Sequence, residues 1–205
     1  MKTKQRSAGG SLVELVVIVA VALGLALGIQ QFLVKPYRIP SESMVPTLEV
    51  GQRVLVNRIG HRFGDPKVGD IVVFHPPAGS ETDACGNSDR PETAACDRPT
   101  PGESDVNFIK RVVAGPGDTI RIVQGHVIRN GKRERDPYIF DTCANNAERG
   151  CNLTTPIKIP PDHWFMMGDN RGESDDSRFW GPVPRDSIIG GAFATYWPPN
   201  RIGLL

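Results

Sequence analysis

The sequence is poor in the features that mark several common classes of protein. Its 205 residues carry a formal net charge of only +1, so no bulk electrostatic attraction to nucleic acid is expected. Its four cysteines include no C-x-x-C spacing, which argues against a zinc or thioredoxin-like site. The nucleophile motif G-x-S-x-G is absent, and none of the four histidines lies in a triad context. We therefore expect no nucleic-acid partner, no metal and no cofactor.

The cysteines form two local pairs, Cys85 with Cys96 and Cys143 with Cys151. In an oxidising compartment such pairs make small-loop disulfides. Three connectivities are possible, and local pairing is the favoured one. The alternative is four free thiols in a cytosolic protein, and the N-terminal segment argues against it.

That segment contains the longest apolar run, residues 15–34, which has no formal charge and follows a short basic N-terminus. As a helix these 20 residues span about 30 Å, the thickness of the hydrocarbon core of a bilayer. We predict a transmembrane signal-anchor over residues 11–34, with residues 1–10 in the cytoplasm. A cleaved signal peptide is the alternative, because residues 26–28 (Ala-Leu-Gly) have the small-x-small form. The apolar run continues past this point, which favours the uncleaved anchor.

The rest of the chain is rich in glycine and proline, with 22 and 18 residues, and has short apolar runs between turns. Turns and strands are expected at residues 51–57, 69–74, 108–113, 119–123, 126–129, 164–167 and 187–197. We predict a mainly β catalytic core of residues 35–124 and 161–205. Residues 79–105 are interpreted as a disulfide-tied insertion loop, and residues 125–160 as a small secondary excursion.

A candidate nucleophile lies directly after the apolar run, in residues 39–48. Pro40 and Pro46 restrict φ there and make a rigid, non-helical turn around Ser43. The alternative is a simple juxtamembrane linker rich in proline and serine.

A serine nucleophile needs a base, and Lys110 in the strand predicted at 108–113 is the candidate. A period of two puts Lys110 and Arg111 on opposite faces, so one of the two cations lies on the more buried face. Burial lowers the pKa of a lysine toward the working pH, which a general base requires. The ordinary alternative is a lysine on a surface edge.

Residues 168–181 are dense in short polar side chains, which lock loops through local hydrogen bonds. Acid–base pairs would rigidify the loop further: Asp169, Asp175 and Asp176 with Arg171 and Arg178. A calcium loop is the alternative, but no glutamate closes it at the twelfth position.

Five blocks occur in an order that resembles the bacterial type I signal peptidase (leader peptidase) family. They are the apolar anchor, P-S-E-S-M-V-P-T-L at 40–48, G-D-I-V-V-F at 69–74, F-I-K-R-V-V-A-G-P-G-D at 108–118 and the polar loop at 168–181. Departures from the family are modest: the chain has one apparent anchor where some members have two, the region 125–161 is short for a Gram-negative member, and two positions within the blocks differ. Glu42, which we expect to face solvent, stands where the family often has glycine, and Gly172 stands where aspartate is common.

The resemblance implies a serine endopeptidase that removes signal peptides from exported preproteins and cleaves after Ala-x-Ala. Ser43 would attack the scissile carbonyl, and neutral Lys110 would take its proton. The Ser43 backbone N–H and the Ser41 hydroxyl would form the oxyanion hole. Ser174 would orient the lysine. Asp176 and Arg178 would pair to support the loop, and shallow substrate pockets would be lined by Tyr37, Ile39, Met44, Leu48, Phe108 and Ile109.

The implied fold is mainly β, a coiled antiparallel β-sheet catalytic body with one N-terminal transmembrane helix. The implied location is the bacterial cytoplasmic (inner) membrane, single-pass, with the catalytic domain on the periplasmic side. Partners would be exported preproteins, the lipid bilayer and, transiently, the secretion translocon. Three rival functions are an anchored non-catalytic domain that binds envelope proteins, a Ser/Lys peptidase of narrower substrate such as a conjugation-pilus processor, and a cytosolic self-cleaving repressor, which the anchor disfavours.

Overall fold

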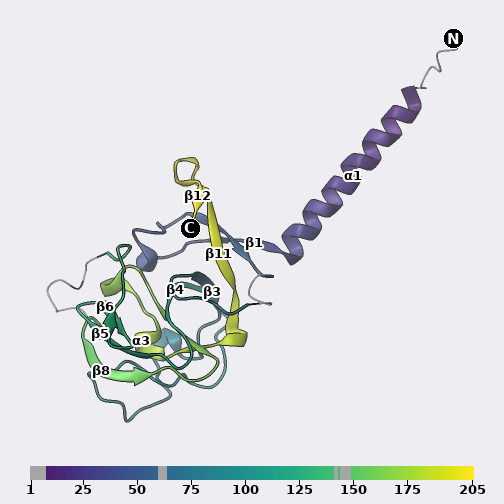
Figure 1. Cartoon of the computed structure of the whole chain (residues 1–205). Coiled ribbons are helices and arrows are strands. Elements are labelled where there is room, and N and C mark those ends of the chain that lie inside the picture. Colours follow the sequence, from purple (N-terminus) through teal and green to yellow (C-terminus); the bar gives the residue numbers. More distant parts are fainter. Residues whose placement is uncertain (1–7, 60–63, 141–142, 144–148) are drawn as a thin grey trace.

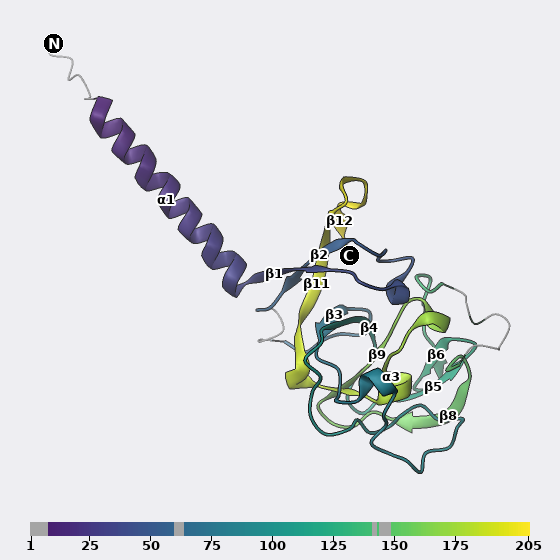
Figure 2. The ribbon, with the colours of Figure 1, turned by 180° about the vertical axis from the view of Figure 1, so that it is seen from behind.

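A long helix precedes a body made of strands. The computed structural model describes residues 8–59, 64–140, 143 and 149–205. Helix α1 (Ala8–Phe32) projects away from the body in both views (Figure 1 and Figure 2). Among the described residues, no helix is both long enough and apolar enough to be assigned as a membrane span. The predicted segment at 11–34 overlaps α1, and its role as an anchor stays a prediction.

The main layer of the body is a curled antiparallel sheet of eight strands, which confirms the mainly β expectation. Its order is β1 (Val34–Arg38), β2 (Arg53–Asn57), β11 (Ile188–Trp197), β3 (Ile71–Phe74), β4 (Phe108–Ala114), β9 (His163–Met167) and β10 (Val183–Pro184), with β12 (Gly203–Leu204) paired to β11. The ten-residue β11 pairs with β2 and β3 and has register shifts against both, which bend the sheet. Gly190 allows the close crossing, because a side chain there would meet the Asn57 carbonyl.

A second antiparallel sheet covers part of the first. Its order is β7 (Lys132–Arg133), β6 (His126–Arg129), β5 (Thr119–Val123) and β8 (Leu153–Lys158). Ile120 and Ile122 of β5 point into a buried cluster with Val113 of β4 and with Phe165 and Met167 of β9. This apolar layer fastens the second sheet to the β4–β9 pair.

Strand β4 lies between β3 and β9, and both of its faces are covered. Val112 packs with Trp180 on one face, whereas Ile109 packs with Ile39 on the other. Lys110 is therefore only 5% exposed and Arg111 only 9%. The sequence pattern put one of these cations on the more buried face, but the structure buries both. It also excludes the surface-edge alternative for the lysine.

Short helical turns and two disulfides complete the body. The turns are the α-helix α3 (Ser177–Trp180) and the 3-10 helices Glu42–Met44, Ser80–Thr82, Arg171–Glu173, Arg185–Ser187 and Pro199–Arg201. Cys85 is bonded to Cys96 and Cys143 to Cys151, with Cα–Cα distances of 5.8 and 5.5 Å. This is the local pairing that the spacing favours.

Candidate active site

Ser43 is fixed in the turn that joins β1 to β2. It lies in the 3-10 helix Glu42–Met44 and is 6% exposed. The turn is held from below because Met44 and Leu48 are fully buried in the apolar cluster of this part of the sheet. It is held from the side because the Asn170 backbone N–H donates to the Ser43 carbonyl at 3.1 Å. The sequence therefore makes this turn rigid through its apolar positions as well as its prolines.

Lys110 is brought to Ser43 across 67 residues of sequence, as the sequence analysis expects. Its Nζ is 2.6 Å from Ser43 Oγ in a buried hydrogen bond. The Phe108 ring centroid lies 5.5 Å from the amine. Burial lowers the pKa of Lys110 from 10.5 to about 8, and nearby carboxylates, above all Asp176, oppose the shift. The amine is thus a base that becomes neutral close to physiological pH.

The other two serines expected at the site differ in their exposure. Ser41 Oγ is 3.3 Å from Ser43 Oγ, on the exposed side of the turn. Ser174 is buried, and within the described part of the chain its hydroxyl has no hydrogen-bond partner. Its expected role in orienting Lys110 stays a prediction. Glu42 is exposed, as expected for a side chain that faces solvent.

The serine and the lysine open onto a cleft of about 510 Å³. Its lining consists of Pro40, Ser41, Ser43, Val106, Asn107, Phe108, Ile109, Lys110, Glu173 and Asp175. Two of the six expected pocket residues, Phe108 and Ile109, are in this lining. Ile39, Met44 and Leu48 are instead fully buried in the apolar cluster under the turn, and Tyr37 packs half-buried against it. The described residues include no group of histidine, cysteine and carboxylate side chains arranged to hold a metal ion.

Comparison with known proteins identifies the family. The sequence model described as "Signal peptidase, peptidase S26" matches residues 12–197. The chain belongs to this family. It is 39% identical to the "Signal peptidase I" of Leptolyngbya laminosa over 98% of this chain and 87% of that protein. It is 37% identical to the "Probable signal peptidase I-2" of Synechocystis sp., over 100% and 82%.

A third relative lies in a different bacterial group. The "Signal peptidase I T" of Bacillus subtilis is 31% identical over 90% of this chain and 84% of that protein. These likenesses run over most of each chain, and they include both the turn of Ser43 and the strand of Lys110. Membership of the signal peptidase family supports a peptidase that removes signal peptides from preproteins.

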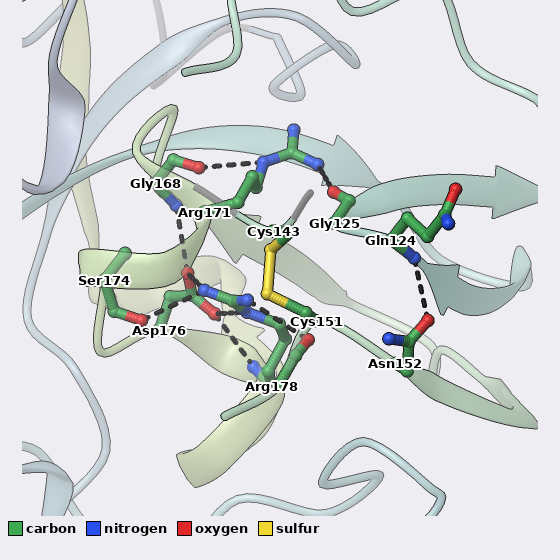
Figure 3. Close-up of a disulfide and its surroundings, with 11 residues drawn as sticks. Gln124, Gly125, Cys143, Cys151, Asn152, Gly168, Arg171, Ser174, Asp176 and Arg178 are labelled. Carbon is green, nitrogen blue, oxygen red and sulfur yellow. Dashed lines mark hydrogen bonds and ion pairs between the residues drawn. A yellow bond between two sulfur atoms is a disulfide. The ribbon is translucent and has the colours of Figure 1, made fainter. Parts of the chain in front are cut away.

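In this signal peptidase family member the loop behind the lysine is fixed by a fully buried ion pair. Arg178 Nε donates to Asp176 Oδ1 at 2.7 Å, and Arg178 Nη2 donates to Oδ2 at 2.8 Å. Asp176 Oδ2 also accepts the Gly168 backbone N–H at 3.0 Å (Figure 3). Burial alone would raise the pKa of Asp176, but Arg178 and these hydrogen bonds hold that pKa below its usual value. This ion pair agrees with the pairing that the family resemblance implies.

Each of the two disulfide-tied loops forms a hydrogen bond with Arg178. The Cys96 backbone N–H donates to the Arg178 carbonyl at 2.9 Å. On the side-chain end, Arg178 Nη1 donates to the carbonyl of Gly150, the residue before Cys151, at 3.2 Å. The two disulfide loops thus hold one arginine by its backbone and by its guanidinium. This convergence was not foreseen, because the cysteine spacing contains no information on what the loops contact.

Arg171 links the second sheet to the same loop. Its Nε donates to the Gly168 carbonyl at 2.9 Å, and its Nη1 donates to the Gly125 carbonyl (Figure 3). Gly125 in turn donates its backbone N–H to the Cys151 carbonyl at 2.8 Å. Gly168, which directly follows β9, is therefore linked through Arg171 and Gly125 to the Cys143–Cys151 disulfide.

A second buried ion pair was missed at the sequence level. Arg111 Nε and Nη2 donate to the two carboxylate oxygens of Asp169 at 2.8 and 2.6 Å. Thr47, four residues after Ser43, donates its hydroxyl to the same carboxylate at 2.5 Å. The sequence pattern indicated only arginines of the loop itself, Arg171 and Arg178, as partners of Asp169. The signal that could have indicated the Arg111–Asp169 pair is the period of two, which places Arg111 on the face of β4 opposite to Lys110.

Proposed function

We propose that the protein is a membrane-anchored serine endopeptidase that removes N-terminal signal peptides from exported preproteins with a Ser43/Lys110 dyad. The observation that carries the proposal is the 2.6 Å contact between Lys110 Nζ and Ser43 Oγ, at the wall of an open cleft. A buried lysine whose pKa lies near 8 is neutral in a large share of molecules at mildly alkaline pH. This is the state in which a lysine accepts the proton of a serine hydroxyl.

The reaction begins with attack of Ser43 Oγ on the scissile carbonyl carbon, while its proton passes to Lys110 Nζ. The negative charge that develops on the carbonyl oxygen needs hydrogen-bond donors. The backbone N–H of Ser43 and the hydroxyl of Ser41, which lies 3.3 Å from Ser43 Oγ, are the proposed donors. Collapse of the intermediate breaks the C–N bond and leaves an ester on Ser43. Lys110 returns the proton to the leaving amine, and then activates the water that hydrolyses the ester.

Specificity for Ala-x-Ala fits a shallow cleft with an apolar wall. Phe108 is half-buried and Ile109 nearly buried at the lining, so only limited apolar surface is offered to a substrate side chain. We propose that the preprotein binds in an extended conformation along this wall, with main-chain hydrogen bonds supplying much of the affinity. Ser174 would turn its unpaired hydroxyl to Lys110 as the amine changes its proton.

Anchoring is proposed from helix α1 and the apolar sequence around it. A helix of 25 residues is about 37 Å long, which exceeds the hydrocarbon thickness of a bilayer. Its described leucine, valine and isoleucine side chains are exposed: Leu12, Val13, Leu15, Val16, Val17, Ile18, Val19, Val21, Leu23 and Leu25. In this proposal residues 1–10 are cytoplasmic and 11–34 form the anchor. The catalytic body lies on the periplasmic side of the cytoplasmic membrane, transiently near the translocon, where both disulfides can form.

The dyad is tested by cleavage of a preprotein with an Ala-x-Ala site by the detergent-solubilised full chain. Ser43→Ala and Lys110→Met should each lower kcat/KM by a thousandfold or more, on the order of the loss seen when a nucleophile or base is removed. The matched controls are Ser88→Ala and Lys158→Met, which alter exposed residues that do not line the cleft. Cleavage at the wild-type rate by either dyad variant would overturn the assignment.

A further inference from the structure

Two carboxylates line the cleft beside the dyad, and nothing in the proposed mechanism uses them. We propose that Glu173 and Asp175 form an acidic wall that makes the enzyme favour preproteins with a lysine or arginine next to the cleaved bond. The inference rests on the proposed function and deepens it, since it adds a charge preference to the Ala-x-Ala rule. It assigns these two residues to specificity rather than to chemistry.

Burial alternates along residues 173–176, and the two exposed side chains are the ones that line the cleft. Ser174 and Asp176 have extended backbone, with φ of −132° and −153°. Successive side chains of an extended chain point to opposite sides. Ser174 and Asp176 are buried, whereas Glu173 and Asp175 are exposed and line the cleft. The same alternation that buries Asp176 therefore leaves Glu173 and Asp175 exposed on the cleft.

Neither wall carboxylate is neutralised by the protein. Within the described part of the chain, no arginine, lysine or histidine forms an ion pair with Glu173 or Asp175. The other two acids of the loop differ, because Asp169 and Asp176 are buried and each is held by an arginine at two points. The charges of Glu173 and Asp175 are therefore available to a substrate.

The charge balance of the cleft changes in the form of the enzyme that reacts. Among the described residues that line the cleft, Lys110 is the only cation, and it must be neutral to act as the base. The reactive form then has two negative charges on its lining and no positive one. Asp175 is also close enough for its charge to raise the pKa of Lys110, so its field extends to the reacting centre.

The size of the effect follows from Coulomb's law. A carboxylate about 8 Å from a substrate charge in water changes binding roughly twofold, because the interaction is close to RT. Two carboxylates each attract a cation and repel an anion, which makes four such twofold factors, so the ratio between lysine and glutamate substrates reaches about 15-fold at low ionic strength. At 1 M salt the screening length falls to about 3 Å, and the ratio should approach one.

Glu173 and Asp175 are not among the residues on which the family resemblance of this loop rests, which include Ser174, Asp176 and Arg178. In the proposal, the two acidic side chains tune the preference of the dyad without taking part in its chemistry.

The test uses the detergent-solubilised full chain and three preproteins that differ only in having lysine, glutamine or glutamate directly after the cleaved bond. Wild type is compared with Glu173→Gln/Asp175→Asn and with the control pair Glu92→Gln/Asp162→Asn. The control removes the same charge at exposed positions that do not line the cleft. The readout is the ratio of kcat/KM between lysine and glutamate substrates, in which any change in the strength of the Lys110 base cancels.

We expect a ratio of about 15-fold for wild type and control at low salt, and a ratio near one for the wall variant. A ratio near one in wild type, or a ratio that the wall variant keeps, would overturn the inference while leaving the proposed function intact. Failure to cleave any of the three substrates would overturn the proposed function as well. Should the wall variant not fold, the wild-type ratio must still fall as salt is raised, and a salt-independent ratio would be contrary to the inference.

Discussion

The pH dependence of kcat/KM should follow the ionisation of Lys110. Burial lowers the pKa of this lysine from 10.5 to about 8, which raises its neutral fraction at pH 7 roughly 300-fold. With that pKa, about one eleventh of the molecules hold the neutral base at pH 7, half at pH 8 and about ten elevenths at pH 9. Because only the neutral amine accepts a proton from Ser43, activity should rise about tenfold from pH 7 to pH 9 and then level off.

A single substitution should move this profile in a known direction. The carboxylate of Asp175 raises the pKa of Lys110, although burial lowers it by more. Asp175→Asn removes a charge that favours the protonated amine, so the rising limb should shift to lower pH. Activity at pH 7 on a substrate without charge near the cleaved bond should therefore increase. The control is Asp162→Asn, which lies outside the cleft and should leave the limb in place.

The assay is the initial rate on a quenched-fluorescence peptide at a concentration well below KM, from pH 6 to pH 10 at constant ionic strength. Far-ultraviolet circular dichroism at each pH shows that the fold is intact. A profile that is flat from pH 7 to pH 9, or one that still rises steeply beyond pH 10, would refute the buried-base argument. A shift of the rising limb of the Asp175→Asn pH profile to higher pH would refute the claim that the Asp175 carboxylate raises the pKa of Lys110.

Three further substitutions test the scaffold of the site. Asp176→Asn leaves its arginine partner buried without a counter-charge, so the free energy of unfolding in urea should fall by about 3–5 kcal/mol. Replacing Cys143 and Cys151 by serine opens a loop of eight-residue separation, and should lower that free energy by about 2.5 kcal/mol. Gly168→Ala directs a methyl group against the Ser43 carbonyl, so kcat/KM should fall about a hundredfold.

Each of these results has an outcome that contradicts it. An Asp176→Asn protein as stable as wild type would mean that the buried pair adds nothing to the fold. Cysteine variants with an unchanged urea midpoint, measured without reductant, would mean that the bridge does not constrain the unfolded chain. A fully active Gly168→Ala enzyme would mean that the turn of Ser43 tolerates displacement. Gly203→Ala, at a glycine with open space around it, is the control for the last case.

The sheet could be predicted from the sequence because its strands are marked by apolar, β-branched runs with turns between them. The runs at 71–74 and 108–113 became β3 and most of β4, and the short segment at 126–129 became β6. Strand β8 was not predicted, because Leu153–Lys158 contains a proline and two threonines and lies in a polar segment. Its place in a second sheet depends on the cluster around Ile120, which links residues distant in sequence.

The proximity of Ser43 and Lys110 in the candidate site could also be predicted, whereas the contacts that support these residues could not. Ser43 and Lys110 lie in motifs whose order is specific, and the structure brings them together. The Arg111–Asp169 pair and the convergence of both disulfide loops on Arg178 arise from tertiary packing, which no local pattern records. The burial of Lys110 follows from the central position of β4, and strand order is likewise a long-range property.

The central claim is that Ser43 is the nucleophile and Lys110 its base, and trapping of the ester tests it most directly. A preprotein is mixed with the full chain, quenched in acid within the first turnover and analysed by intact and peptide-level mass spectrometry. We expect an adduct whose mass is that of the released signal peptide minus one water, located on Ser43 and absent from Lys110→Met. An adduct on another residue, or an equal adduct in Lys110→Met, would contradict the dyad.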